Sequence, residues 1–170
     1  PTVTAIASSS AICLGSSSTL SGSGANSYTW NLGVITGSNT VVSPTVTTSY
    51  TLTGVNASGC SNTKTLAITV NPNPTVSIVA SPSVICIGAT STLTASGAVT
   101  YLWNTSATSA SITTTPTVTT MYTVTGTNAV GCSQTQTLNL VVNSLPTLTV
   151  SSSSASICNS SSVTLTGAGA

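Results

Sequence analysis

Residues 44–60 read PTVTTSYTLTGVNASGC, and residues 116–132 read PTVTTMYTVTGTNAVGC. Both stretches are rich in Thr, Val and Tyr, which favour β-strands, and both continue into Asn and Gly, which favour turns. Each stretch therefore predicts a strand that runs into a hairpin turn, with Cys60 or Cys132 at the start of the following strand. Two such similar stretches in one chain indicate a repeated β domain.

The repeat extends to both sides of these stretches. Three units open on a Pro-Thr pair, and each has a cysteine 12 residues after its proline (13−1, 86−74, 158−146). These first cysteines lie 73 and then 72 residues apart (86−13, 158−86), a domain-sized period that is longer than a solenoid repeat. We therefore expect one domain over residues 1–73, a second over 74–145, and the first strands of a third over 146–170.

The pattern of apolar residues predicts an all-β fold. In the last strand of the first unit, Leu66, Ile68 and Val70 fall on one face and Thr65, Ala67 and Thr69 on the other. The second unit repeats this pattern with Leu138, Leu140 and Val142. Short strands separated by frequent turn signals predict an immunoglobulin-like β-sandwich in each unit, and a closed barrel is the weaker alternative.

Aromatic residues recur in register and are the expected centre of each small core. Because the Tyr and Trp of the Tyr-x-Trp motif are two residues apart on a strand, both rings should point to the same side. Sugar-stacking by the tryptophans is the alternative, which the in-register tyrosine disfavours. The predicted core aromatic residues are Tyr28, Trp30, Tyr50, Tyr101, Trp103 and Tyr122.

The five cysteines follow the repeat. We predict one disulfide within each complete unit, Cys13 with Cys60 and Cys86 with Cys132, which leaves Cys158 unpaired in this chain. Disulfides indicate an oxidising, exported environment. The absence of a Cys-x-x-Cys pair and of histidine argues against a zinc site.

Composition excludes several classes of function. The chain has no Asp, Glu or His and one Lys, so it cannot assemble the usual catalytic triads, and we predict no enzyme activity, no metal site and no cofactor. Lys64 is expected to be a solvent-facing residue because its counterpart in the second unit is Gln136. A formal charge of +1 argues against nucleic-acid binding, and no apolar stretch is long enough for a membrane helix.

The order of motifs resembles a known family. Ile-Cys-x-Gly, Ser-Thr-Leu, Tyr-x-Trp-Asn, Pro-Thr-Val-Thr-Thr-x-Tyr-Thr and Gly-Cys-Ser occur in this order in both complete units. This order resembles the PKD-like or Ig-like tandem repeats of large secreted surface proteins of Bacteroidota. The resemblance implies spacer or adhesive modules in gliding adhesins or filaments, often exported by a type IX system. It therefore implies a secreted, extracellular or cell-surface location.

The near absence of charge suggests what the domains do. Soluble domains carry about a quarter charged residues, which keep molecules apart. Our hypothesis is therefore a structural segment of an extracellular filament or adhesin, a rod-like array that self-associates through Thr- and Ser-rich surfaces. A carbohydrate- or surface-binding or spacer module, with surface glycans as the partner, is the alternative. Residues 146–170 are expected either to continue in a longer array, the favoured interpretation, or to complete a sandwich in another subunit.

Overall fold

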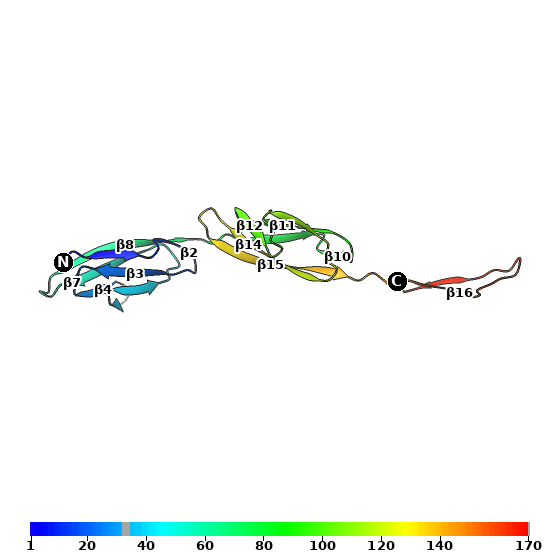
Figure 1. Ribbon diagram of the computed structural model, residues 1–170, viewed down its shortest axis with the longest axis horizontal. Helices are drawn as coiled ribbons and strands as arrows, with labels where there is room; N and C mark the ends of the chain where they lie inside the picture. The colour runs from blue at the N-terminus through cyan, green and yellow to red at the C-terminus, as the bar shows by residue number, and fades with distance from the viewer. Residues whose placement is uncertain (32–34, 170) are drawn as a thin grey trace. The chain divides into compact units, whose positions relative to one another are not determined.

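The computed structural model describes residues 1–31 and 35–169 (Figure 1). Within these residues every regular element is a β-strand, so the prediction of an all-β chain is confirmed. The chain divides into two compact units. One comprises Pro1–Val76, Gly97–Tyr101 and Thr125–Thr135, and the other Ser77–Ser96, Leu102–Val124 and Gln136–Ala170.

Two sheets form from the strands of the first repeat. The smaller sheet has the order β1-β3-β6, and the larger has the order β2-β8-β7-β4-β5. The strands of the smaller sheet are β1 (Thr4–Ala7), β3 (Ser18–Ser23) and β6 (Asn39–Val42). Those of the larger sheet are β2 (Ala11–Cys13), β4 (Ser27–Trp30), β5 (Ile35–Thr36), β7 (Thr48–Val55) and β8 (Ser61–Asn71).

This strand order is that of an immunoglobulin-like sandwich. Strands β1, β3 and β6 take the places of A, B and E in one sheet, and β4, β7 and β8 take those of C, F and G in the other. Most neighbours are antiparallel, but β2 runs parallel to β8, with Cys13 opposite Asn71. The predicted immunoglobulin-like fold is therefore confirmed, and the barrel alternative is wrong.

The second repeat has the same topology. Its sheets have the orders β13-β11-β9 and β10-β15-β14-β12, which match those of the first repeat strand for strand, except that β5 has no counterpart among the described residues. One sheet contains β9 (Ser77–Ser81), β11 (Ser91–Ser96) and β13 (Ser111–Thr114). The other contains β10 (Val84–Cys86), β12 (Thr100–Trp103), β14 (Thr120–Thr127) and β15 (Ser133–Asn143).

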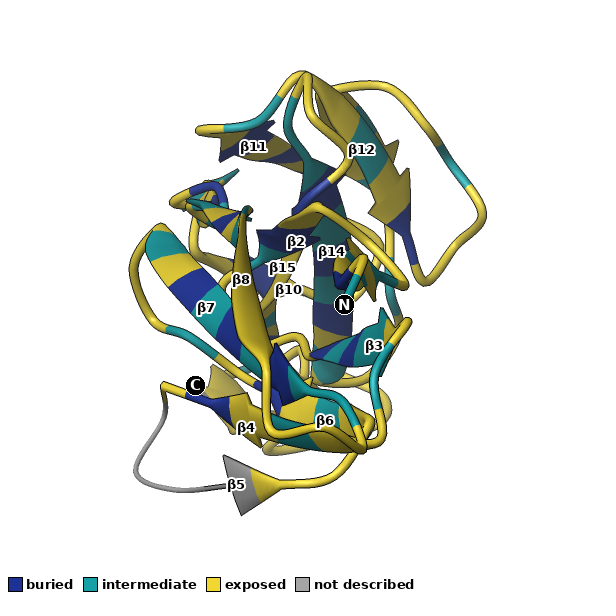
Figure 2. Ribbon diagram, turned by 90° about the vertical axis from the view of Figure 1, so that its left-hand side faces the viewer, coloured by how far each residue is buried: buried dark blue, intermediate teal, exposed yellow. Residues whose placement is uncertain are grey.

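Alternation of buried and exposed residues builds each core. Along β7, Tyr50 and Leu52 point inward, and Figure 2 shows the stripes that result. In β8, Ile68 is buried while Ala67 and Thr69 are exposed, as predicted. The core of the first repeat consists of Val3, Ile12, Leu20, Trp30, Val42, Tyr50, Leu52 and Ile68.

A two-stranded sheet follows the second repeat. Strands β16 (Thr149–Ser152) and β17 (Leu165–Ala168) pair with each other, in the same antiparallel manner as β1 with β3. Leu165 is 68% exposed, whereas its repeat equivalents Leu20 and Leu93 are fully buried. The two strands therefore expose an apolar residue that the complete repeats cover.

Close backbone packing makes one glycine of the second repeat a test of the fold. Gly97 has a φ of +90°, and a Cβ there would lie 1.8 Å from the carbonyl oxygen of Thr75. Gly88 has a similar φ of +86°, but a Cβ there meets no atom within 4 Å.

We predict that Gly97→Ala destabilises the domain more than Gly88→Ala. Both substitutions carry a conformational cost of about 1–2 kcal/mol for a positive φ, and only Gly97→Ala adds a clash with the backbone. Urea denaturation followed by tryptophan fluorescence should give a lower midpoint for Gly97→Ala. Equal midpoints would contradict the close approach of residues 75 and 97.

Candidate functional site

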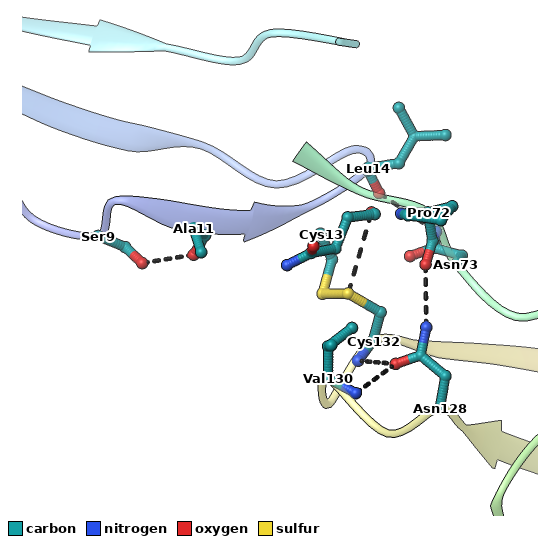
Figure 3. The surroundings of a disulfide bond; sticks show 10 residues. Ser9, Ala11, Cys13, Leu14, Pro72, Asn73, Asn128, Val130 and Cys132 are labelled. Atoms are coloured by element: carbon teal, nitrogen blue, oxygen red, sulfur yellow. Dashed lines mark hydrogen bonds between the residues drawn. A yellow bond between two sulfur atoms is a disulfide. The ribbon is translucent and has the colours of Figure 1, made fainter. Parts of the chain in front are cut away.

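A disulfide between Cys13 and Cys132 joins distant parts of the sequence covalently. Their Cα atoms lie 5.5 Å apart, and the bond spans 119 positions of sequence (Figure 3). Both residues belong to the first compact unit, which includes residues 125–135 of the second repeat. The bond therefore connects the first sequence repeat to the second.

The predicted pairing within each repeat is wrong. Cys13 lies opposite Asn71 at the end of β8, whereas Cys60 directly precedes the beginning of β8 at Ser61. A strand of 11 residues, at about 3.3 Å per residue, places these cysteines roughly 35 Å apart. A disulfide requires Cα atoms within about 7 Å, so the two cysteines of one repeat cannot bond in the folded domain.

The same geometry separates the cysteines of the second repeat. Cys86 lies opposite Asn143 at the end of β15, and Cys132 directly precedes Ser133, where β15 begins. The predicted Cys86–Cys132 bond is therefore also wrong. Within the described part of the chain, Cys60, Cys86 and Cys158 are exposed thiols without a disulfide partner.

Hydrogen bonds of asparagine side chains hold the segments around the bond. Asn128 Oδ1 accepts from the backbone N–H of Val130 at 3.2 Å and of Cys132 at 2.9 Å. Its Nδ2 donates to the carbonyl oxygen of Pro72 at 3.0 Å (Figure 3). Asn128 thus shapes the hairpin that carries Cys132 and attaches it to the linker between the repeats.

The other side of the bond is fixed in a similar way. The N–H of Leu14 donates to the carbonyl oxygen of Asn71 at 2.9 Å, and Asn73 Nδ2 donates to the carbonyl oxygen of Leu14 at 3.2 Å. Both ends of the bond are therefore attached to residues 71–73. This arrangement holds two sulfur atoms that are far apart in sequence within bonding distance.

The predicted aromatic residues lie at the cores. Trp30 is fully buried and Trp103 is 2% exposed, so neither indole presents a face to a sugar. Tyr50 and Tyr122 are also buried, and Tyr28 and Tyr101 are half-buried. The Tyr28 hydroxyl donates to the carbonyl oxygen of Ala25 and accepts from its N–H, and Tyr101 does the same with Ala98.

Paired hydroxyl groups cover outer surfaces of the sheets. The Oγ1 atoms of Thr51 and Thr65 lie 3.1 Å apart across β7 and β8, and those of Thr125 and Thr135 lie 3.0 Å apart across β14 and β15. Lys64 is exposed and is the only Lys or Arg of the chain. These faces are therefore almost uncharged and mix hydroxyl groups with exposed apolar residues such as Met121 and Val141.

No helix in the described residues is long and apolar enough to cross a membrane. An open depression of about 570 Å³ lies beside Tyr28 and is lined by neutral residues. Its lining residues are Asn26, Ser27, Tyr28, Thr29, Thr36, Gly37 and Ser38. It offers amide and hydroxyl groups but no ionisable catalytic pair.

A scan against protein-family models and a search of curated proteins gave no match. Among solved structures, the chain is similar to a Ca²⁺-stabilised adhesin of an Antarctic bacterium that binds ice, with 17% identity and a TM-score of 0.40. The match covers 88% of this chain and 51% of the adhesin chain.

Two further solved structures show weaker similarity. The amphioxus IgVJ-C2 molecule is 13% identical with a TM-score of 0.36, over 77% of this chain and 99% of that one. The SGBP-B protein of the Bacteroides ovatus mixed-linkage glucan utilization locus is 15% identical with a TM-score of 0.24, over 81% of this chain and 44% of that one. Similarities this low carry no argument about what the present chain binds.

The position of the only Lys allows a direct test of the disulfide. Trypsin can cut the unfolded chain only after Lys64, which separates residues 1–64 from 65–170. We predict that the two fragments stay joined on a non-reducing gel, because Cys13 and Cys132 lie on different fragments, and separate after reduction. Thiols should be blocked before the chain is unfolded in urea, to prevent exchange. Two separate bands without reductant would instead support bonds within each repeat.

Paired serine variants measure what the bond contributes. On a chain-entropy model, closing a loop of 119 positions stabilises the fold by about 5 kcal/mol. We therefore expect Cys13→Ser combined with Cys132→Ser to lower the melting temperature clearly. The matched control, Cys60→Ser combined with Cys86→Ser, should leave it unchanged. Equal losses in both double variants would contradict the observed pairing.

Proposed function

We propose that this chain is a non-enzymatic structural segment of an extracellular adhesin-like or filament-forming protein. The observation that carries the proposal is the covalent bond from Cys13 to Cys132, which links consecutive sequence repeats rather than stapling each one. A bond of this kind limits extension of the chain, which is useful in a spacer or fibre and has no role in catalysis. The proposed organisation is an array of domains over residues 1–73 and 74–145, followed by the strands of a third unit over 146–170.

Composition supports an extracellular structural role. With no Asp, Glu or His, the chain lacks the side chains that commonly transfer protons in catalysis. A disulfide persists in oxidising compartments, so we place the protein outside the cell or on its surface. Its similarity to repeats of secreted Bacteroidota proteins fits this location.

We further propose that the uncharged outer faces mediate association between copies. The paired threonines of β7 with β8, and of β14 with β15, present hydroxyl groups without charge repulsion. Association of such faces should depend little on pH or salt. For residues 146–170 we propose continuation in a longer array, with donation of their strands to another subunit as the alternative.

A carbohydrate- or surface-binding module is the second candidate. The depression beside Tyr28 supports it, because amides and hydroxyls are the groups that bind sugar hydroxyls. Burial of Trp30 and Trp103 removes the aromatic platforms that would favour this candidate. We therefore rank it below the structural role.

Charge insertion tests the self-association. Thr63, Thr65, Thr135 and Thr137 are exposed, and changing all four to Lys places four positive charges on the outer faces. In a background where Cys60, Cys86 and Cys158 are Ser, we expect the parent to form concentration-dependent oligomers in sedimentation velocity at several pH and salt values. The Lys variant should be monomeric.

The matched control changes the same four threonines to Ser, which keeps the hydroxyls and the neutral surface. This variant should associate like its parent. A parent that is a monodisperse monomer at high concentration, or a Lys variant that associates equally, would contradict the proposed role of these faces. Circular dichroism of all three proteins checks that they are folded.

A further inference from the structure

The cysteines of this chain are of two structural kinds. Cys13 and Cys86 each end a short strand and lie opposite the final residue of the long strand beside it. Each begins a turn in which the N–H three residues later donates to the cysteine carbonyl oxygen, at 2.9 Å for Ser16 and 3.0 Å for Ala89. Cys158 begins the same turn, in which Ser161 is the donor at 3.0 Å. We call these three residues the strand-end cysteines.

The third residue of each turn has a positive φ, so the three turns share their backbone conformation. Gly15 has a φ of 90°, Gly88 of 86° and Ser160 of 69°. The free thiols of Cys86 and Cys158 therefore stand at the start of the same kind of turn as the bonded Cys13.

Cys60 and Cys132 are the second kind, which we call the hairpin cysteines. The N–H of Cys60 donates to Asn56 Oδ1 at 2.9 Å, as the N–H of Cys132 does to Asn128 Oδ1. In both hairpins the asparagine N–H also donates to the cysteine carbonyl oxygen, at 2.9 Å. The exposed thiol of Cys60 thus stands in the same local structure as the bonded Cys132.

The observed bond joins one cysteine of each kind. The long strand between the two kinds prevents them from meeting within one folded repeat, so a bond of this type requires two repeats. On the hairpin side, Asn128 is also held by a backbone carbonyl oxygen, that of Pro72, which residues other than proline can equally supply. The hairpin and the turn that carry the bonded cysteines therefore recur at the other cysteines.

We propose that Cys60 forms a disulfide with a strand-end cysteine of another immunoglobulin-like domain, and that Cys86 and Cys158 each form one with a hairpin cysteine of another such domain. The partner is a thiol of the opposite kind, on a further repeat of the same polypeptide or on a second copy of the chain. Bonds between opposite kinds give the array a direction. This inference requires a disulfide oxidant and a partner thiol, and it goes beyond the proposed self-association, which involves no covalent bond.

Each bond would form by thiol–disulfide exchange with a disulfide oxidant, such as oxidised glutathione or an oxidoreductase. One cysteine loses its proton and attacks a sulfur of the oxidant, which releases one thiol and leaves a mixed disulfide. The partner cysteine loses its proton and attacks the protein sulfur of this mixed disulfide, which releases the second thiol. Two electrons pass to the oxidant, whose disulfide becomes two thiols.

Disulfide mapping of the native protein decides the proposal. Cells should be treated with a thiol-blocking reagent before lysis, and the protein digested without reductant by a protease that cleaves beside aliphatic residues. We expect each peptide that contains Cys60 or Cys86 to be linked to a peptide that contains a cysteine of the opposite kind. Blocked thiols at these positions, or links between cysteines of the same kind, would overturn the proposal. Mobility on reducing and non-reducing gels shows whether the links lie within one polypeptide.

Complementary variants of this chain test a second copy as the partner. Cys60→Ser leaves only strand-end thiols free, and Cys86→Ser combined with Cys158→Ser leaves only the hairpin thiol. In a glutathione redox buffer, we expect each variant alone to run as a single chain on a non-reducing denaturing gel, and an equimolar mixture to form disulfide-linked heterodimers that reductant separates. Homodimers of either variant in equal yield would overturn the pairing of opposite kinds. If mapping of the native protein shows links between opposite kinds but the mixed variants form no heterodimers, the partner lies on another repeat of the same polypeptide.

Discussion

The length of one strand controls the covalent structure of this chain. In each complete repeat the last strand has 11 residues, with a cysteine directly before its first residue and another opposite its last. Backbone hydrogen bonding to neighbouring strands keeps this strand extended, so the two thiols are held at its opposite ends. A repeat therefore cannot close its own disulfide, and the bond that forms connects Cys13 of one repeat with Cys132 of the next.

The bond and the surface chemistry have separate physical effects. Small domains with few aromatic residues gain limited stability from their cores, and a cross-link adds to it by restricting the unfolded chain. Here the closed loop includes most of two repeats, so one bond constrains both. The outer faces carry hydroxyl pairs rather than charges, so the proposed contact between copies should depend little on proton and salt concentration.

Much of the fold could be predicted from the sequence because it depends on local patterns. The alternation of apolar and polar residues around Ile68 and Leu140 predicted which face of the last strand is buried in each repeat. The Tyr-x-Trp motif predicted that Trp30 and Trp103 lie in the cores. The disulfide could not be predicted from the repeat alone, because counting cysteines per unit ignores where the strands carry them. The sequence placed Cys60 just before the last strand, but only the structure shows that Cys13 lies at the far end of this strand. The length of the strand then separates the two cysteines too far for a bond.

Single-molecule extension from the two chain ends tests the central claim most directly. With the Cys13–Cys132 bond intact, we predict that force extends only residues outside it, because the bond bypasses everything between them. Addition of reductant should then release about 400 Å of further length, since 119 positions contribute up to roughly 3.6 Å each. Release of length from residues between 13 and 132 before reduction would contradict the account.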